Sequence, residues 1–157
     1  MEIELYGNKL KVFEDGTILH FGKRKPNKDI YYEKWNSIHQ GYKQIQLCNE
    51  GKYKMFKVHR IIGLVYKELD INDSSHCIDH IDRNRANNHI DNLRLVTHQQ
   101  NHFNKNSKGC YYYKRGKTWK SQIKLNGKNI HIGYFATEQE AHAAYLVAKQ
   151  KYHIMPT

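Results

Sequence analysis

Short apolar runs separated by glycine-containing turns are the feature that most limits what this chain can form. Each run holds only a few apolar residues, and the next run follows after one tight turn. Paired runs of this kind are a strong signal for β-hairpins. The turns in question are Asp15-Gly16, Glu50-Gly51 and Asn126-Gly127. We therefore expect small antiparallel sheets, each with a small hydrophobic core.

One helix is expected directly after the second hairpin. In residues 58–66 the apolar side chains recur every three or four positions, which is typical of an amphipathic helix. His59 and Arg60 lie off this apolar stripe. We expect both at the solvated surface of the helix, with a contact to a phosphate group as the alternative.

Two capping boxes predict further helices. In the first, the side chains of Thr97 and Gln100 can each bond the other's backbone amide, so a helix is expected to start at Thr97 with Asn101 in its first turn. The second box runs from Thr137 to Glu140 and precedes a stripe of alanines at helical spacing. Small side chains would let this last helix lie close on a sheet.

The chain is strongly basic. It carries 26 Lys and Arg against 15 Asp and Glu, a formal charge of +11. Such a surplus favours a polyanionic partner, with nucleic acid first and an anionic membrane surface second. A surplus of +7 lies in residues 107–157, after a polar stretch at 104–109. This break in composition predicts a module boundary.

Other features bear on where the protein works. No run of about 18 apolar residues exists, so a membrane-spanning helix is not expected. The first residues lack the apolar region of a secretory signal. The cysteines, Cys48, Cys77 and Cys110, are too far apart for a zinc ribbon and give little support to a disulfide framework. We expect free thiols in a reducing compartment and a cytoplasmic location.

The central residues 75–106 show the pattern strand, loop, strand, helix. Residues 77–81 and 93–96 are the predicted strands, and the polar residues 82–88 form the loop between them. So short a unit cannot bury a core of its own. Neighbouring segments or a bound metal must therefore complete it.

Asp79, His80 and Asn101 supply the groups that hydrolysis of a phosphodiester needs. A neutral imidazole can take the proton of water. A carboxylate and an amide oxygen suit Mg²⁺ or Mn²⁺, which stabilise the charge on the phosphate and the leaving oxygen. Asp79 and His80 would point to opposite faces of a flat strand, so the strand must twist or end there. By spacing alone, a strand-end pair held by turn hydrogen bonds is the commoner explanation.

The longer string of residues favours the catalytic interpretation. Residues 78–84 (IDHIDRN), residues 87–97 (NNHIDNLRLVT) and then Asn101 follow in order. Over residues 56–106 this sequence resembles the HNH homing endonuclease family, in its phage type, with its ββα-metal motif, the His-Me finger. The resemblance implies metal-dependent cleavage of DNA that leaves 5′-phosphate and 3′-hydroxyl ends.

The resemblance also assigns roles, position by position. It implies that His80 is the general base, that Asp79 is a metal ligand, and that Asn92 ties the loop and orients the histidine. Asn101 stands where many members have a final histidine, which makes this chain resemble an H-N-N variant. With Asn101 as the second metal ligand, Mg²⁺ or Mn²⁺ is the favoured ion, and no zinc is expected. Arg94, on the second strand, is expected to hold the scissile phosphate.

Residues 107–154 resemble the APETALA-two/ethylene-response type of DNA-binding domain. The matching residues include Trp119, Ile123, residues 132–135 and Thr137. The pattern itself predicts a three-stranded antiparallel sheet with one helix across it, and the resemblance implies that this sheet enters the major groove of DNA.

Strand alternation divides the faces of this sheet. Four side chains would face the helix: Ser121, Ile123, Ile130 and Ile132. On the outer face, lysines would contact phosphates, and Gln122 and Asn129 would read base edges. The expected DNA contacts on that face are Tyr111, Tyr113, Lys120, Gln122, Lys124, Asn129 and His131.

Together these patterns predict an α+β fold in three parts. Residues 1–54 would form short antiparallel strands, residues 55–106 a ββα-metal core, and residues 107–157 a three-stranded antiparallel sheet packed on one helix. The expected function is a divalent-metal-dependent endonuclease that acts on double-stranded DNA as a monomer. A non-catalytic DNA-binding regulator is the alternative, which would shift DNA in a gel without nicking it. RNA binding is a third possibility, tested by competition against duplex DNA at matched salt.

Overall fold

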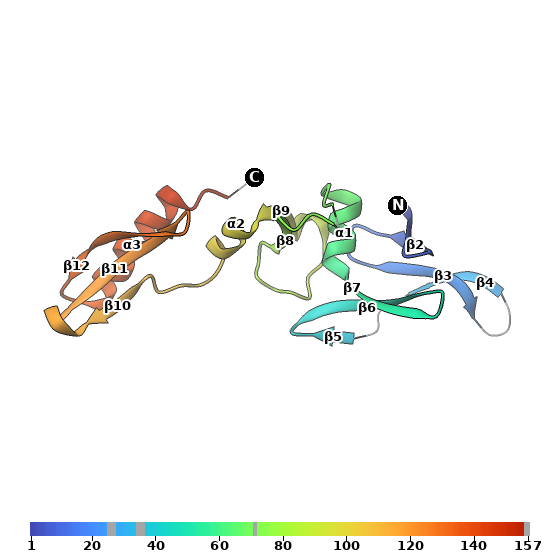
Figure 1. Cartoon of the computed structure of the whole chain (residues 1–157), viewed down its shortest axis with the longest axis horizontal. Helices are drawn as coiled ribbons and strands as arrows, with labels where there is room; N and C mark the ends of the chain where they lie inside the picture. Colours follow the sequence, from blue (N-terminus) through green and yellow to red (C-terminus); the bar gives the residue numbers. More distant parts are fainter. Residues whose placement is uncertain (25–27, 34–36, 71, 156–157) are drawn as a thin grey trace. The chain divides into compact units, whose positions relative to one another are not determined.

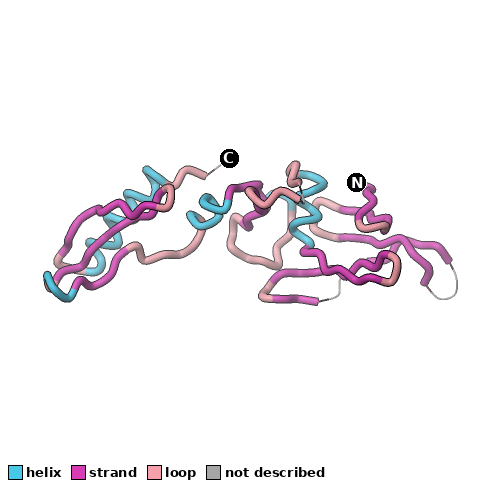
Figure 2. The backbone as a smooth tube through the Cα atoms, in the orientation of Figure 1, coloured by secondary structure: helices cyan, strands magenta, loops and turns pink. Residues whose placement is uncertain are grey.

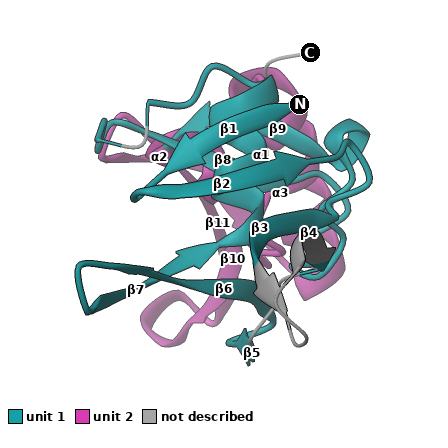
Figure 3. Ribbon diagram, turned by 90° about the vertical axis from the view of Figure 1, so that its right-hand side faces the viewer, with its two compact units in different colours: residues 1–97 teal, residues 98–157 magenta. Residues whose placement is uncertain are grey.

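The computed structural model describes residues 1–24, 28–33, 37–70 and 72–155. In this part of the chain, short strands joined by tight turns alternate with a few helices (Figures 1 and 2). The strand pairs are antiparallel, which confirms a fold of small antiparallel sheets and helices. Contacts divide the chain into two compact units, Met1–Thr97 and His98–Thr157 (Figure 3).

The first unit begins with two sheets. The first contains, in order, β1 (Glu2–Leu5), β2 (Asn8–Val12), β3 (Ile18–Arg24) and β4 (Lys28–Glu33). The second contains β5 (Ser37–His39), β6 (Tyr42–Asn49) and β7 (Lys52–Lys57). Gln40-Gly41 and Glu50-Gly51 join the strands of the second sheet with positive φ at both residues, 51° and 82°, then 48° and 76°. This is the hairpin turn whose twist matches that of the flanking strands.

The central segment adds one helix and a two-stranded sheet. α1 (Val58–Tyr66) follows β7 directly, as expected. β8 (His76–His80) and β9 (Leu93–Thr97) then pair so that Asp79 lies opposite Arg94 and His80 opposite Leu93. A short 3-10 turn, η1 (Ile90–Asn92), precedes β9 and was not expected from the sequence.

One hydrophobic core joins the N-terminal strands to the central segment. Its fully or nearly buried side chains are Leu10, Val12, Ile18, Ile45, Leu47, Phe56, Val58, Ile61, Ile62, Leu69, Ile78 and Leu93. The short β8–β9 hairpin thus obtains its core from its neighbours. Residues 1–54 and the central segment therefore belong to the same compact unit, and the contacts divide the chain after Thr97.

The second unit begins with α2 (His98–Phe103), which follows β9 directly, and ends with a three-stranded sheet and a long helix. The sheet contains β10 (Cys110–Tyr113), β11 (Thr118–Leu125) and β12 (Lys128–Phe135), with the 3-10 turn η2 (Lys114–Gly116) after β10. α3 (Glu138–Tyr152) starts at the expected capping box, in which Thr137 and Glu140 bond each other's backbone amides. Ile123 of β11 and Tyr145 of α3 form the centre of its small core.

A β-bulge interrupts the alternation of β12. Ser121 pairs with Gly133, but the next residue, Gln122, pairs with His131, so Ile132 is an extra residue on β12. Ile132 still packs against the core beside Ile123. Beyond the bulge the faces exchange, because one inserted residue reverses the direction of every following side chain.

No helix in the described part of the chain has the length and apolar character that a bilayer crossing requires. The three cysteines are free thiols, as expected from their spacing.

The packing of Gly109 gives a stability prediction. Gly109 and Gly127 both have positive φ, 64° and 77°, where alanine is strained. A Cβ atom at Gly109 would overlap the ring of Tyr145, whereas one at Gly127 would meet nothing within 4 Å. We expect Gly109→Ala to lower the free energy of unfolding by about 1–3 kcal/mol more than Gly127→Ala. Thermal unfolding followed by tryptophan fluorescence measures this, and equal losses in the two variants would contradict the packing.

Candidate functional site

His80 is the last residue of β8 and is only 5% exposed. Its Nε2 lies 3.3 Å from Oδ1 of Asn88, a buried residue of the following loop. The amide of Asn88 is oriented by its own Nδ2, which donates to the carbonyl of Ala86. Asn88 therefore presents an acceptor to His80, which favours the neutral imidazole with its hydrogen on Nε2 and its lone pair on Nδ1.

The surroundings of His80 keep it neutral. Burial lowers its pKa below the usual value, and the charge of Arg85 acts in the same direction. The hydrogen bond to Asn88 and the carboxylates of Asp79 and Asp82 raise this pKa but do not cancel the effect of burial. The imidazole is therefore unprotonated at neutral pH and able to accept a proton.

His59 lies beside His80, contrary to the expectation that it would be on the solvated helix surface. It is 6% exposed, its ring meets that of His80 edge-on at 5.0 Å between centroids, and Tyr42 lies 4.8 Å away. Burial first, and then the charge of His80, lower the pKa of His59 to about 3. Its Nδ1 is buried without a hydrogen-bond partner.

The geometry of α1 explains why its apolar stripe did not reveal His59. Strands from both N-terminal sheets, together with β8 and β9, pack around α1. More than one side of the helix is therefore buried, and a histidine off the apolar stripe still lies inside. No pattern in the sequence marks it.

Asp79 precedes His80 and has a different neighbour. Its Oδ2 accepts from Nε and Nη2 of Arg94 at 3.0 and 2.8 Å, and its side chain is 7% exposed. A carboxylate this buried requires a charged partner, and the strand register supplies one directly opposite. Arg94 was expected to hold the scissile phosphate. In the structure its guanidinium pairs with Asp79, and the contact to the phosphate stays a prediction.

Asn92 ties the two ends of the loop that follows β8. Its Nδ2 donates to Oδ1 of Asp82 at 2.9 Å and to the carbonyl of Asn87 at 2.8 Å, and its Oδ1 accepts from the backbone amide of Asp82 at 3.0 Å. The loop that Asn92 closes also carries Asn88. Asn92 thus helps to hold in place the residue that contacts His80.

The β2–β3 turn supports this loop from the other side. The carbonyl of Glu14 accepts from the backbone amide of Ile90 at 2.7 Å. Gly16 lies so close to Asn88 that a Cβ atom on it would be 2.8 Å from Cβ of Asn88. The N-terminal strands therefore help to position the contact to His80, a role that the sequence did not indicate.

The donor groups beside His80 suit a hard divalent ion. Mg²⁺ typically takes one or two carboxylates from the protein and completes its shell with waters and substrate phosphates. Asp79 offers one such carboxylate. Among the residues that the structure describes, no group of three or more His, Cys, Asp and Glu side chains could hold a metal.

Asn101 lies on α2, in the second unit, and is half-buried. Its assignment as a metal ligand stays a prediction from the sequence.

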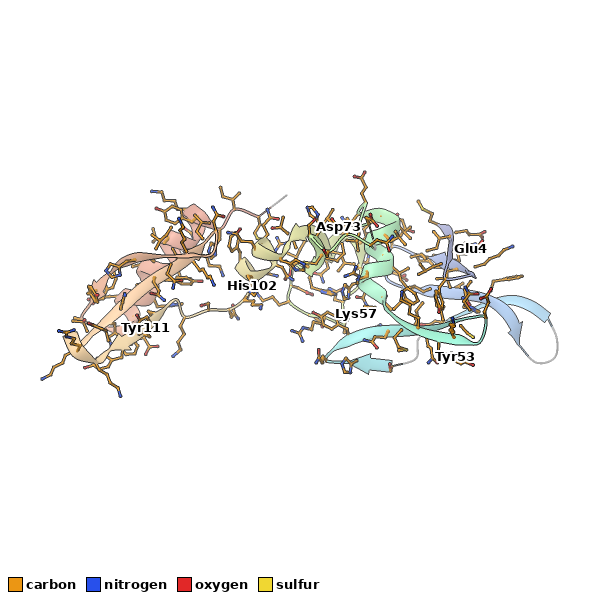
Figure 4. The ribbon with its side chains drawn as sticks, viewed as in Figure 1. Glu4, Tyr53, Lys57, Asp73, His102 and Tyr111 are labelled. Carbon is orange, nitrogen blue, oxygen red and sulfur yellow. The ribbon has the colours of Figure 1, made fainter. Side chains whose placement is uncertain are left out.

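The residues expected on the outer face of the C-terminal sheet lie together on one face in the structure. Cross-strand partners place the predicted contacts side by side: Tyr111 with Lys120, Gln122 with His131, and Lys124 with Asn129, while Tyr113 lies opposite Thr118. Tyr111 projects from β10 in Figure 4 and is 44% exposed. Ser121 and Ile123 are buried beneath α3, as expected.

Tyr134 is an addition to this face. Strict alternation would turn it inward, but the bulge at Ile132 turns it out, where it is 53% exposed. Its ring lies 4.7 Å from that of His131 and 5.7 Å from that of Tyr113. A bulge leaves no clear signal in one sequence, which is why this residue was missed.

A cleft of about 660 Å³ opens within the second unit. Its lining combines α2 residues, among them Gln99 and Phe103, with four of the predicted DNA contacts: Tyr111, Gln122, Lys124 and Asn129. These four side chains thus border a concave surface rather than a flat one.

Comparison with known proteins shows what the central segment is similar to. Residues 56–103 match the model of the HNH endonuclease family. An uncharacterized HNH endonuclease of Acanthamoeba polyphaga mimivirus is 38% identical over 93 residues, covering 57% of this chain and 49% of that protein. The DNA endonuclease I-HmuI of Bacillus phage SP01 is 39% identical over 69 residues, covering 44% of this chain and 38% of that protein.

A solved structure of the HNH homing endonuclease I-HmuI, described as showing DNA binding and cleavage, aligns at 25% identity with a TM-score of 0.48, covering 79% of this chain and 70% of that one. The chain spans less than half the length of the two relatives above. The segment that carries Asp79, His80, Asn92 and Asn101 is therefore similar in sequence to the HNH endonuclease family, and the relatives that match the chain are named as endonucleases.

Proposed function

We propose that this protein is a divalent-metal-dependent endonuclease that hydrolyses phosphodiester bonds of double-stranded DNA. The observation that carries the proposal is His80, a buried, neutral imidazole held by Asn88 within the segment that matches HNH endonucleases. A neutral histidine fixed at a strand end is what a general base requires. A silent scaffold in a DNA-binding regulator would not need it.

His80 is the proposed catalytic base. Its Nδ1 lone pair accepts the proton of a water molecule, whose oxygen attacks the phosphorus while the bond to the 3′-oxygen of the sugar breaks. The leaving 3′-oxygen takes a proton from solvent water. This direction of cleavage gives 5′-phosphate and 3′-hydroxyl ends. Asn88 accepts the hydrogen bond from the Nε2 N–H group throughout the reaction and so holds the ring in position. Asn92 closes the loop that carries Asn88.

Asp79 is the proposed protein ligand for Mg²⁺ or Mn²⁺, with Asn101 as the second ligand expected from the sequence. When bound, such an ion supplies positive charge to the phosphate and to the leaving oxygen. Arg94 orients the Asp79 carboxylate through Oδ2. No zinc is expected in this H-N-N variant, because carboxylate and amide oxygens are hard ligands.

The outer face of the C-terminal sheet is the proposed DNA-binding surface. Lys120 and Lys124 would contact phosphates, and Gln122 and Asn129 would read base edges. Tyr134 joins this set because the bulge turns it outward next to His131. The remaining proposed contacts are Tyr111 and Tyr113. In this proposal the protein acts as a monomer and is a homing endonuclease of the phage type.

Metal dependence tests the function directly. We expect purified protein to convert supercoiled plasmid into nicked or linear DNA in the presence of Mg²⁺ or Mn²⁺. Excess EDTA is expected to stop cleavage, and added Mg²⁺ to restore it. The plasmid forms are separated on an agarose gel. A shift of the DNA without nicked or linear product, at any divalent ion, would instead indicate the non-catalytic regulator.

A further inference from the structure

Two cations lie over the ring of Tyr42, close to His80. Nζ of Lys57 is 4.5 Å from the ring centroid and Cζ of Arg85 is 4.9 Å from it. Lys57 stands where β7 passes into α1 (Figure 4), and Arg85 belongs to the loop after β8. Residues from three separate segments therefore converge on one aromatic ring, whose face attracts positive charge.

Among the described residues, no acidic side chain forms an ion pair with either of these cations. The ion pairs found in the described residues involve other groups, and neither Lys57 nor Arg85 takes part in one. Arg94 differs in this respect, because its charge is balanced by Asp79. Two like charges held at one ring repel each other, so the arrangement favours an anion between or beside them.

The backbone prepares the guanidinium for such an anion. Nη1 of Arg85 donates to the carbonyl of Gln40 at 3.0 Å. Gln40 has a φ of 51°, a conformation that non-glycine residues rarely adopt, and with Gly41 it makes the tight turn between β5 and β6. This bond uses one of the five N–H groups of the guanidinium. The others can bind a phosphate in the forked geometry that arginine favours.

The cluster borders the proposed base. The ring of Tyr42 lies 5.9 Å from that of His80, and the charge of Arg85 contributes to the lowered pKa of His80. An anion held by these cations would thus lie near the bond on which His80 acts. In a DNA substrate, the anions next to the bond that is cleaved are the backbone phosphates.

We propose that Lys57 and Arg85, held on the ring of Tyr42, form a binding site for a backbone phosphate of the DNA next to the bond that is cleaved. The inference rests on the proposed function for its substrate. It gives the N-terminal sheet a direct part in binding DNA, since Tyr42 and Gln40 come from β6 and its turn.

The test compares charge-removing variants on a fluorescein-labelled DNA duplex of arbitrary sequence, with EDTA present. Binding is measured across a series of salt concentrations, because each phosphate contact contributes about 0.9 to the slope of log affinity against log salt. We expect the double variant Lys57→Gln/Arg85→Gln to lower that slope by about 0.9 or more and to bind more weakly at every salt concentration.

Lys54→Gln is the matched control. Lys54 lies on the same strand, also stands over aromatic rings, those of Tyr6 at 5.8 Å and Phe56 at 5.3 Å, and loses the same charge. Its side chain points to the opposite face of β7. We expect its salt slope to equal that of the wild type. Equal slopes for the double variant and Lys54→Gln would overturn the proposal.

Two variants of Tyr42, whose ring holds the two cations, complete the test. Tyr42→Phe keeps the ring and should bind like the wild type, whereas Tyr42→Leu removes it and should bind like the double variant. Wild-type binding by Tyr42→Leu would refute the part assigned to the ring. Because EDTA prevents cleavage, these results do not depend on the nuclease activity. A lowered slope in a protein that never cuts plasmid with Mg²⁺ would keep the phosphate site and reject only the endonuclease.

Discussion

Replacing His80 with alanine is expected to lower the rate of DNA cleavage by about 10²–10⁴-fold, the usual contribution of a general base. DNA affinity should change little, because His80 is buried and is not itself one of the proposed DNA contacts. The rate is measured as nicking of supercoiled plasmid with Mg²⁺, and affinity by gel shift in EDTA. His39→Ala, which removes an exposed histidine on β5, is the control and should cleave like the wild type.

The pH profile separates loss of the base from a general disturbance of the site. Because burial lowers the pKa of His80, the imidazole loses its proton below pH 6.5. Wild-type cleavage should therefore rise with pH through a midpoint below 6.5 and level off by neutral pH. His80→Gln should cleave slowly and lack this rise. Wild-type rates in His80→Ala, with its circular dichroism unchanged, would place the base on another residue.

Local signals in the sequence predicted the local structure well. Glu50-Gly51 and Asn126-Gly127 make the expected hairpin turns, and Thr137 caps the last helix, because each feature is decided by residues close in the chain. The division into compact units depends on contacts between distant segments. No local pattern showed that Leu10 and Ile78 would share one core.

The site shows the same limit. The resemblance to HNH endonucleases singled out His80, Asp79 and Asn92, which lie in one short segment. The residues that surround or support His80 come from other elements: Tyr42 of β6 and His59 of α1 contact its ring, and Gly16 packs against Asn88. Neighbours of this kind are set by tertiary packing, so a single sequence cannot identify them. Arg94 illustrates the converse, because the register of β8 and β9 commits it to Asp79.

Loss of Arg94 is expected to have the largest effect on stability. Arg94→Met leaves the Asp79 carboxylate, 7% exposed, without its partner, and breaking a buried ion pair in this way costs about 3–5 kcal/mol. Asp79→Ala should cost less. The side chain of Arg94 is 19% exposed and long enough to bring its charge to water, whereas the shorter Asp79 cannot. Urea unfolding, monitored by circular dichroism, gives both free energies.

The double variant Arg94→Met/Asp79→Ala completes the cycle. If the pair accounts for the cost, the double variant should be more stable than Arg94→Met, because the buried carboxylate is removed together with its arginine. The same proteins also separate stability from catalysis. Asp79→Ala should lose cleavage with Mg²⁺ while staying folded, since Asp79 is the proposed metal ligand. An Arg94→Met protein as stable as the wild type would show that the ion pair with Arg94 does not stabilise the buried Asp79 carboxylate. Binding of the scissile phosphate would then be the remaining proposed role of Arg94.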